Sequence, residues 1–344
     1  MKLFMIVGLP KGGKTTYANQ LKEQNPDAVV VSYDELRGTV PTDVEDIKAE
    51  TLKLACDKIR EAFSDGKDVI YDHTNVTRET RKVALDVADE FNAEKNAYIV
   101  WAPYEMCVER AIDATPDVTE DVIKSIIIQW QSPYYDEGFK NITLTVATDE
   151  AVDKDCVQNY VSRMMMEHKP NSPQNLWEHC HGANAIAASM GKPLDIIDAA
   201  LWHDVGKILV RVYEGTGDSF MEEYHDNVGG YLVYGVYIAK HFPVAIHASW
   251  VVCHHMDAEA NTPYYQSLPD DLKKKLDDIH EVTDKQTETI RIIMKRHERD
   301  LARAKAREEY LAAHPQTEND GVINDEGSAV DIPVDDSTPP PPIY

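Results

Sequence analysis

Residues 8–16 read Gly8-Leu9-Pro10-Lys11-Gly12-Gly13-Lys14-Thr15-Thr16, which fits the pattern G-x-x-x-x-G-K-[ST] without a mismatch. The apolar run at residues 3–7 has the length of a buried strand, and an amphipathic helix is predicted to begin at Thr16. A phosphate-binding loop needs this order of strand, loop and helix, because the glycines and the helix N-terminus direct backbone N–H groups toward an anion. The alternative, a glycine-rich turn that binds nothing, is disfavoured by both flanks.

The loop residues have specific expected roles when the anion is the triphosphate of ATP. Lys14 is predicted to reach the β- and γ-phosphates, and the Thr15 hydroxyl is predicted to hold Mg²⁺. The remaining nucleotide-binding positions are expected to cradle the phosphates, and they are Gly8, Lys11, Gly12, Gly13 and Thr16. ATP and Mg²⁺ are therefore the expected cofactors of this site.

Length and hydropathy set the broad class of protein. With 344 residues the chain has room for two domains of ordinary size. No apolar run reaches the roughly 18 residues of a membrane span, and the N-terminal apolar run continues directly into the loop. We therefore expect neither a membrane span nor a signal peptide. The expected location is the cytoplasm, or the host cytoplasm if the chain is phage-encoded.

Charge and cysteine usage narrow the chemistry. The formal net charge of −25 counts against broad, sequence-independent binding to nucleic acid, although a local basic groove stays open. The five cysteines are scattered without C-x-x-C spacing, which favours reduced thiols. After Arg307 the chain has Asp and Glu but no Lys or Arg, and it ends in a proline run. This composition predicts a disordered tail.

Residues 1–150 alternate short apolar runs with helical patterns. After the first run, the further apolar runs lie at residues 28–31, 69–71, 97–101 and 142–146. Such alternation predicts an α/β domain with a parallel sheet, in which ligands bind at the carboxyl ends of the strands. Polar segments follow two of those ends, at residues 33–37 and 72–75.

Four segments together resemble the kinase domain of bacteriophage-type polynucleotide 5′-hydroxyl kinases and related small P-loop kinases. They are residues 8–16, Ser32-Tyr33-Asp34-x-x-Arg37, Asp72-x-Thr74-Asn75 and Arg78-x-x-Arg81, within roughly the first 145 residues. The resemblance implies that Asp34 is the general base for the attacking hydroxyl and that Arg37 contacts the acceptor phosphate, roles that suit in-line attack on the γ-phosphate. From the residues alone, Asp34 could instead cap the next helix. Asp72 could support Mg²⁺ binding or be a turn residue.

The segment after the fourth predicted strand departs from this family, whose lid usually carries several arginines. Between Pro103 and Lys140 the only arginine is Arg110. Residues 113–117 resemble a shortened lid, and residues 132–139 resemble the S/E-x-P-x-x-x-E-G-F segment common after the lid helix in these kinases. Arg110 is therefore the expected clamp on the transferring phosphate. Either catalysis depends on Lys11, Lys14 and Arg110 together, or phosphoryl transfer is weak.

Beyond residue 173 helical patterns replace the strands. Residues 199–207 read Ala-Ala-Leu-Trp-His-Asp-Val-Gly-Lys and resemble the A-x-L-x-HD-x-GK signature of HD-domain metal-dependent phosphohydrolases. Adjacent His203 and Asp204 at the end of an apolar helix offer one metal ion an imidazole and a carboxylate. This mixed donor set suits Mn²⁺, Fe²⁺, Co²⁺ or Zn²⁺.

Other residues resemble the rest of the HD ligand order. The resemblance implies His179 as the first histidine, with His181 as the alternative. Residues two apart on a helix point about 200° apart, so only one of these two histidines can face the metal. His225 and the pair His254-His255 resemble the extra histidines of members that hold two metals, and Asp284 resembles the last carboxylate ligand. The predicted metal ligands are thus Thr15 in the first site and His179, His203, Asp204, His225, His254 and Asp284 in the second. His225 and His254 could instead hydrogen-bond the substrate phosphate.

Two prolines, at positions 170 and 173, interrupt the helical pattern between the two halves. The predicted organisation is a P-loop kinase domain at 1–150, a connecting helix and linker at 151–173, an all-α HD phosphohydrolase domain at 174–313 and a disordered acidic tail at 314–344. This combination resembles bifunctional end-healing enzymes of RNA repair, in which a kinase phosphorylates a 5′-hydroxyl and a hydrolase opens a 2′,3′-cyclic phosphate and removes the 3′-phosphate. It implies RNA or DNA ends as substrates and leaves room for a ligase partner.

Two other functions stay open from the sequence. One is a nucleoside or nucleotide kinase joined to an HD nucleotide phosphohydrolase, which the net charge of −25 favours slightly. The other is an HD hydrolase gated by a domain that binds ATP without transferring phosphate, which the arginine-poor lid favours.

Overall fold

The computed structural model describes residues 1–114, 118–151, 155–168, 174–213, 220–240 and 244–313. Met1–Lys295 form one compact unit and Arg296–Tyr344 a second. The predicted disordered tail at 314–344 lies outside the described residues. Among the helices that are described, none is both long enough and apolar enough to cross a bilayer.

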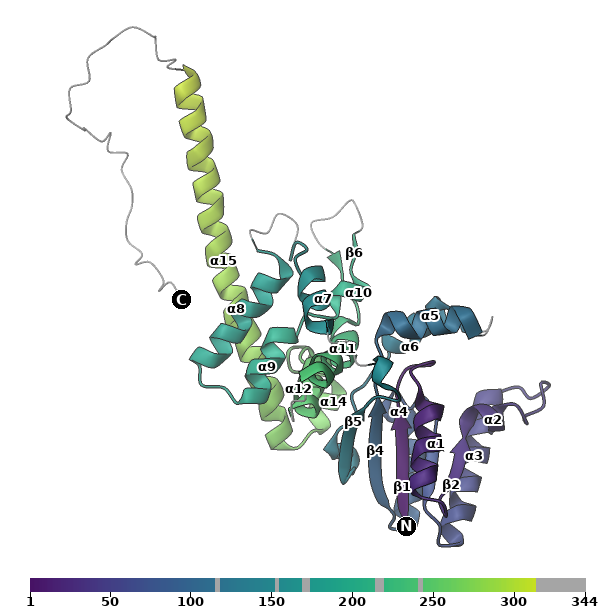
Figure 1. Ribbon diagram of the computed structural model, residues 1–344. Helices are drawn as coiled ribbons and strands as arrows, with labels where there is room; N and C mark the ends of the chain where they lie inside the picture. Colours follow the sequence, from purple (N-terminus) through teal and green to yellow (C-terminus); the bar gives the residue numbers. More distant parts are fainter. Residues whose placement is uncertain (115–117, 152–154, 169–173, 214–219, 241–243, 314–344) are drawn as a thin grey trace. The chain divides into compact units, whose positions relative to one another are not determined.

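The N-terminal half is built on a parallel sheet of five strands in the order β2-β3-β1-β4-β5 (Figure 1). The strands are β1 (Lys2–Val7), β2 (Val29–Ser32), β3 (Val69–Asp72), β4 (Glu94–Val100) and β5 (Asn141–Thr145). β1 is central, and its residues from Leu3 to Val7 are all buried, as expected for a strand covered on both faces. The predicted parallel α/β sheet is confirmed. Its order places the carboxyl end of β1 between those of β3 and β4.

Helices connect these strands. They are α1 (Lys14–Gln24), α2 (Tyr33–Arg37), α3 (Ile47–Ser64), α4 (Arg78–Glu90), α5 (Tyr104–Ala114) and α6 (Glu120–Ile127), and two short 3-10 helices, η1 (Tyr135–Glu137) and η2 (Asp149–Ala151), flank β5. Four of the helices follow a residue whose side chain accepts a backbone N–H of the first turn, namely Ser32 for α2, Asp46 for α3, Thr77 for α4 and Thr119 for α6. The sequence thus supplies local start signals for the crossovers.

The second half is mainly helical. Its helices are α7 (Cys156–Arg163), α8 (Leu176–Ser189), α9 (Leu194–Trp202), α10 (Lys207–Val210), α11 (His225–Lys240), α12 (Ala245–Cys253), α13 (Asp257–Ala260), α14 (Pro263–Ser267) and α15 (Asp270–Ala313). Between α10 and α11 the backbone adds a two-stranded antiparallel ribbon of β6 (Val212–Tyr213) and β7 (Phe220–Met221). The all-α prediction did not include this ribbon.

The sheet and the helices of the second half share one hydrophobic core. Trp101, just after β4, donates its indole N–H to the Tyr231 carbonyl on α11 (3.2 Å), and the Tyr231 hydroxyl donates to the Ala102 carbonyl (2.6 Å). Gly235 permits this approach, because a Cβ there would lie 2.4 Å from the Trp101 ring. Among the described residues, packing therefore continues across the predicted boundary near residue 173.

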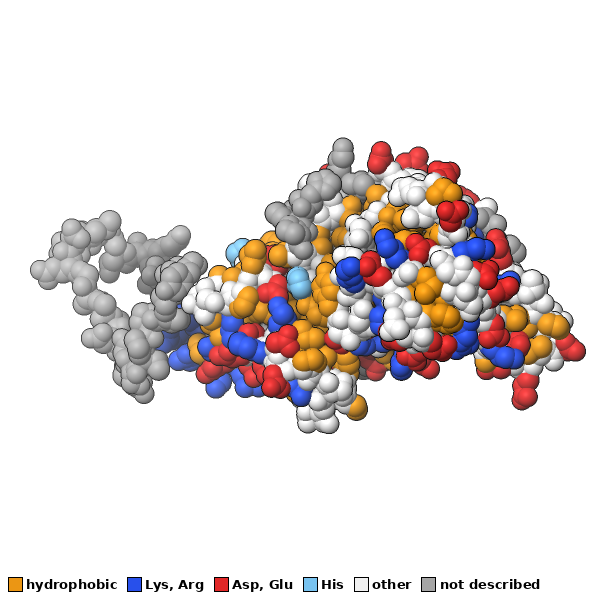
Figure 2. Space-filling model, turned by 90° about the horizontal axis from the view of Figure 1, so that it is seen from below, with side chains coloured by type: hydrophobic (Ala, Val, Ile, Leu, Met, Phe, Trp, Pro, Cys, Tyr) orange, Lys and Arg blue, Asp and Glu red, His pale blue; other side chains and the backbone are white. Residues whose placement is uncertain are grey.

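Charge is mixed on the face shown in Figure 2, where Lys and Arg side chains alternate with Asp and Glu. Exposed pairs such as Lys82 with Asp86 (2.6 Å) and Arg60 with Glu90 (2.8 Å) neutralise cations locally. Broad binding to nucleic acid uses a continuous basic surface, and this face does not present one.

Candidate active sites

The first candidate site is a cleft of about 980 Å³ formed by residues that follow β1, β2, β3 and β5 and by residues of α5 and α6. Most of the predicted kinase residues line it, namely Lys11, Gly13, Lys14, Thr15, Thr16, Asp34, Arg37 and Arg110. Gly8 and Gly12 shape the backbone beside it, since the Gly8 N–H donates to the Thr74 carbonyl (3.0 Å) and the Gly12 N–H to the Leu9 carbonyl (3.2 Å). The structure therefore gathers these sequence-predicted residues around one cleft.

Two loop positions require glycine. Gly13 has φ +93°, a left-handed conformation that side chains rarely adopt, and a Cβ there would lie 2.4 Å from the Ala147 side chain. A Cβ at Gly8 would lie 2.5 Å from the Val100 carbonyl oxygen. The motif glycines thus let the loop pass closely over the ends of β4 and β5.

Lys14 and Thr15 hold the two chemical functions of the loop. Lys14 donates from Nζ to the Leu9 carbonyl (2.9 Å), and burial lowers the pKa of its amine while Asp72 opposes that shift. Thr15 donates from Oγ1 to Asp72 Oδ2 (2.7 Å). Burial raises the pKa of Asp72, and the Thr15 hydrogen bond and the Lys14 charge counter it. A hydroxyl and a carboxylate at hydrogen-bond distance are hard oxygen donors that fit Mg²⁺.

Asp34 and Arg37 reach the cleft from α2. This helix is capped by Ser32, whose hydroxyl accepts the Glu35 N–H (3.4 Å), so Asp34 is not the cap that one interpretation of the sequence allowed. Asp34 is exposed in the first turn and Arg37 is the last residue of the helix, and both line the cleft with Lys14. A carboxylate and a guanidinium thus flank the space beyond the phosphate loop.

The arginines divide into two groups. Arg110 lies on α5, lines the cleft and donates from Nη1 to the Lys11 carbonyl (3.3 Å). Residues 115–117 of the predicted lid lie outside the described residues. Arg81 is 0% exposed and makes a bidentate ion pair with Glu137 (2.7 and 2.9 Å). Arg78 pairs with Asp136 (2.8 Å). The last two arginines therefore anchor the segment at 132–139 and do not line the cleft.

His73 is a cleft residue that the site prediction did not include. Its ring lies 4.0 Å from the Tyr33 ring, centroid to centroid, and its Nδ1 lies 3.3 Å from Asn75 Oδ1. Burial lowers the pKa of His73 to about 4, so the ring is neutral at pH 7. Its position directly after Asp72, at a strand end, was the available signal.

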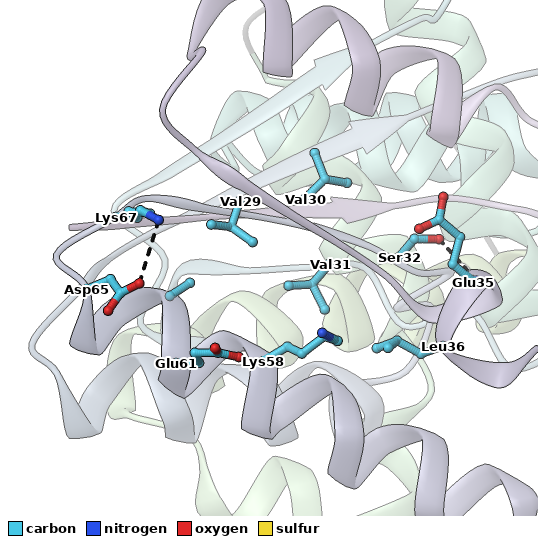
Figure 3. A pocket seen from close by; sticks show the side chains of 11 residues that line it. Val29, Val30, Val31, Ser32, Glu35, Leu36, Lys58, Glu61, Asp65 and Lys67 are labelled. Carbon is cyan, nitrogen blue, oxygen red and sulfur yellow. Dashed lines mark hydrogen bonds and ion pairs between the residues drawn. The ribbon is translucent and has the colours of Figure 1, made fainter. Parts of the chain in front are cut away.

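A separate hollow of about 320 Å³ lies along the edge strand β2 and α3 (Figure 3). Valines of β2 form one wall, and charged side chains of α3 and its following turn form another. Lys67 and Asp65 in this wall pair with each other (3.6 Å). The hollow contains none of the loop residues, so we assign the chemistry to the larger cleft.

The second candidate site is a cluster of imidazoles around Asp204 in the helical half. Its carboxylate lies 3.4 Å from Nε2 of both His179 and His203, and 3.3 Å from Nε2 of His225. His255 joins through its Nε2, which lies 3.3 Å from Nε2 of His225. Three sets of possible metal ligands overlap at Asp204 within the described residues.

Local structure aims these side chains inward. Asn175 and Glu178 form a capping box that fixes the start of α8 and thereby turns His179 toward the interior. His203 and Asp204 follow the last residue of α9. Gly206 lets α11 approach them, because a Cβ there would lie 1.9 Å from the His225 carbonyl oxygen.

The ring orientations show that the cluster fits a cation. Nδ1 of His203, His225 and His255 each lies 2.8 to 2.9 Å from the carbonyl oxygen three residues earlier. A carbonyl only accepts hydrogen bonds, so each Nδ1 carries a proton, and each neutral ring then has an acceptor lone pair on Nε2. Nε2 atoms that face one another at 3.1 and 3.3 Å need a proton or a metal ion between them.

Charge around Asp204 is balanced within the protein. Lys207 donates to Asp204 Oδ2 (2.8 Å) and also contacts Glu222 (2.9 Å). Burial alone would raise the pKa of Asp204, but the charge of Lys207 leads the effects that outweigh burial and hold that pKa well below its ordinary value. Asp204 is thus a carboxylate, as a metal ligand must be.

Two predicted ligands are not in the cluster, and one alternative is settled. His181 is exposed beside Trp177, so His179 and not His181 lies in the cluster. His254 pairs with Asp257 (2.6 Å), and His255 takes the cluster position instead. The reason is that α12 ends at Cys253, and His254 leaves the helical phase with ψ 13°.

Asp284 is the second predicted ligand that lies outside the cluster. Its side chain is 69% exposed and lies 3.6 Å from His280. Gln286 is a buried polar residue on this part of α15, and its amide donates to the His179 carbonyl (3.2 Å). Two residues correspond to about 200° around a helix, so Gln286 and Asp284 face opposite ways.

Comparison with known proteins agrees with the first site. Residues 3–129 match the family model described as an AAA domain. The matched residues include the phosphate loop and the strands β2, β3 and β4 that follow it. The match ends before the helical half, whose assignment rests on its own geometry.

Two of the curated relatives each match 46% of this chain. An L-seryl-tRNA(Sec) kinase from Methanococcus maripaludis is 24% identical over 163 residues, which are 46% of this chain and 64% of the relative. A bifunctional polynucleotide phosphatase/kinase from Schizosaccharomyces pombe is 26% identical over 167 residues, 46% of this chain and 35% of the relative. The chain thus spans less than two thirds of either relative. Among solved structures, a fungal RNA kinase has a TM-score of 0.32 and 18% identity, with 50% of this chain and 92% of that chain covered.

Proposed function

We propose that the P-loop domain transfers the γ-phosphate of ATP to a 5′-hydroxyl end of RNA or DNA. The observation that supports this most is that Asp34 and Arg37 line the same cleft as Lys14 and the Thr15–Asp72 pair. One carboxylate that is not tied to the phosphate loop is what a hydroxyl acceptor needs as its base. The two curated relatives are named as a kinase of L-seryl-tRNA(Sec) and a polynucleotide phosphatase/kinase, which favours an acceptor that contains nucleic acid.

In this proposal each side chain has one task. Lys14 contacts the β- and γ-phosphates, and Thr15 and Asp72 hold the Mg²⁺ that would neutralise phosphate charge. Asp34 accepts the proton of the 5′-hydroxyl while the hydroxyl oxygen forms a bond to the γ-phosphorus and ADP leaves. Arg37 binds the phosphate of the acceptor strand, and Arg110 with Lys11 stabilises the transferring group.

We propose further that the helical half is an HD-type hydrolase for 2′,3′-cyclic phosphate and 3′-phosphate ends. His179, His203, Asp204, His225 and His255 would hold a divalent transition metal such as Mn²⁺, Fe²⁺, Co²⁺ or Zn²⁺, which would supply an activated water. The carbonyl-anchored rings fix the Nε2 lone pairs toward this position. Lys207 keeps Asp204 ionised.

The two activities suit the two ends of one break. RNA cleaved through its own 2′-hydroxyl leaves a 2′,3′-cyclic phosphate and a 5′-hydroxyl, and this protein would convert them into a 3′-hydroxyl and a 5′-phosphate. A ligase that joins such ends would be the partner reaction. The net charge of −25 suits recognition of ends better than binding along a strand.

A second candidate is a hydrolase gated by ATP. It is favoured by the contact between Tyr231 and Ala102, because Tyr231 lies on the helix that begins with His225 and Ala102 lies beside the phosphate loop. In this version the P-loop domain binds ATP and the hydrolase responds.

One assay separates the proposals. The purified protein is incubated with labelled ATP and Mg²⁺ against 5′-hydroxyl RNA, 5′-hydroxyl DNA, nucleosides and nucleotides in parallel, and hydrolysis of 2′,3′-cyclic phosphate RNA is followed with and without ATP. Labelling of polynucleotide ends supports the kinase, and Asp34→Asn should remove it. Labelling of nucleosides or nucleotides alone would replace the acceptor with a small molecule. Hydrolysis that requires ATP without any labelling would favour gating.

A further inference from the structure

His168 lies between α7 and α8, outside every segment that resembles the HD family. Its backbone N–H donates to the Gln174 carbonyl (3.2 Å), and Glu167 and Asn175 form a β-bridge, so the chain is fastened directly before α8. The Arg211 guanidinium donates to the His168 carbonyl (3.1 Å). The side chain is only 3% exposed, although the residue belongs to a connecting segment.

The His168 ring reaches the Asp204 cluster. Its Nε2 lies 3.9 Å from Asp204 Oδ2, and the ring stacks on His179 with centroids 3.8 Å apart and planes 11° apart. One ligand atom from each of His168, His179 and Asp204 lies within 4.8 Å of the others. With metal–nitrogen bonds of about 2.0–2.1 Å, two ligand atoms of one ion are separated by at most about 4 Å. The spacing therefore fits a shared ion once one of the two stacked rings rotates, because each imidazole binds a metal in its own ring plane and the two planes are now nearly parallel.

We propose that His168 is a ligand of the metal site in the helical half, an inference that rests on the proposed hydrolase. The cluster then has three overlapping groups of ligand atoms that share Asp204. His168 and His179 belong to the first, Cys180 and His203 to the second, and His225 and His255 to the third.

The misplaced carboxylate gives this assignment its chemical reason. Asp284 does not approach the cluster, and a buried polar residue nearby, Gln286, uses its amide on a backbone carbonyl. Without His168, the first group would contain one imidazole, that of His179, and the shared carboxylate. His168 supplies a further nitrogen and raises the share of imidazole, which favours transition metals over Mg²⁺.

The assignment also changes where the metal site is built. His168 comes from the segment that joins the P-loop half to the helical half, so a fragment that starts at residue 174 would lack a ligand. The competing explanation is that His168 only stacks on His179 and orients it. The two roles differ in whether a nitrogen of residue 168 touches the ion.

The test uses the full chain loaded with Co²⁺, with His168→Gln and His168→Gly as variants and His181→Gln as the matched control on exposed α8 surface. Loss of a residue that only orients a ligand costs about 10–100-fold in metal affinity, so loss of a ligand should cost about 100-fold or more. Chelator competition measures the affinity, and the visible absorption of bound Co²⁺ reports its nitrogen ligands. We expect His168→Gln to weaken Co²⁺ binding and alter the spectrum, and His181→Gln to match wild type.

Two further measurements separate ligation from packing. Added imidazole should restore the wild-type Co²⁺ spectrum in His168→Gly by filling the vacated position. In thermal unfolding, His168→Gln should lower the midpoint with Co²⁺ present but much less with excess chelator, since a ligand acts only through bound metal.

The outcomes are distinct. An unchanged Co²⁺ spectrum in His168→Gln, or an equal fall in midpoint with and without metal, would overturn His168 as a ligand while leaving the hydrolase intact. Absence of Co²⁺ and Mn²⁺ binding by wild type would overturn the metal site itself.

Discussion

Replacing Arg81 by Met tests whether the arginines after β3 serve phosphoryl transfer or the fold. The Arg81 guanidinium is 0% exposed and donates to both carboxylate oxygens of Glu137 (2.7 and 2.9 Å). It also donates to the carbonyls of Asn75 (3.0 Å) and Gln131 (2.9 Å). The group thus ties the end of β3 to the segment before β5. It does not line the nucleotide cleft.

The expected loss follows from what the substitution leaves behind. The Glu137 side chain is 4% exposed, and after the change its remaining partners among the described residues are the Tyr134 N–H (3.1 Å) and the Arg78 guanidinium at 3.6 Å. Removal of one partner from a buried ion pair costs about 3–5 kcal/mol, because a charge stays buried without compensation. We expect Arg81→Met to lower the free energy of unfolding by about 3–5 kcal/mol.

Urea unfolding followed by tryptophan fluorescence measures this loss, because Trp101 and Trp130 are in the shared core. The double variant Arg81→Met, Glu137→Gln should regain part of the loss, since it removes the unpaired charge. Arg78→Met, at a side chain that is 25% exposed, is the control and should cost less. The KM for the acceptor should not change in the folded fraction. An Arg81→Met protein of wild-type stability with a tenfold higher acceptor KM would refute this reasoning.

Three further predictions concern the two sites. Lys14→Ala should reduce kinase activity on the order of a hundredfold or more, because it removes a fixed charge at the transferring phosphate; hydrolase activity should persist, and equal loss of both would favour ATP gating. After chelation, Mg²⁺ should restore the kinase alone, whereas Mn²⁺ or Co²⁺ should restore the hydrolase; full hydrolase activity with Mg²⁺ would contradict the histidine metal site. Burial lowers the pKa of His73 from 6.5 to about 4, so the unfolded chain takes up a proton that the folded chain refuses as pH falls through this window. The free energy of unfolding should therefore fall from pH 7 to pH 4.5. In urea titrations at the two pH values, this fall should be smaller for the His73→Gln variant than for wild type.

The sequence predicted the P-loop half well because its signals are local. The order of apolar run, glycine loop and helix can be recognised without knowing which distant residues are in contact. The segments that follow β2 and β3 carry the polar residues that meet at the cleft. Asp34 could not be separated from a helix cap until Ser32 was seen in that role. Arg78 and Arg81 resembled functional residues, but their partners lie more than 50 positions away.

The second site shows what a linear pattern misses. His254 and His255 are neighbours, and which of them faces Asp204 depends on α12 ending at Cys253. Asp284 and Gln286 lie two positions apart on one helix and face opposite ways, and Gln286 is the one of the two that is buried. His168 follows no motif, and its place in the cluster depends on how the segment after α7 folds back. Residues of these kinds require three-dimensional packing to be identified.

Packed residues of the shared core connect the two sites. His225 begins α11, and Tyr231 lies six residues further, about 9 Å along the helix at 1.5 Å per residue. Tyr231 holds both the N–H and the carbonyl of Ala102, and a Cβ at Gly12 in the phosphate loop would lie 3.8 Å from the Ala102 side chain. One rigid helix therefore contacts the neighbourhood of the phosphate loop and carries a residue of the metal cluster. Binding at one site can change affinity at the other only if this helix has two arrangements that the ligands distinguish. Without such arrangements, the same contacts would only stabilise both sites, and the two reactions would proceed independently on one folded unit.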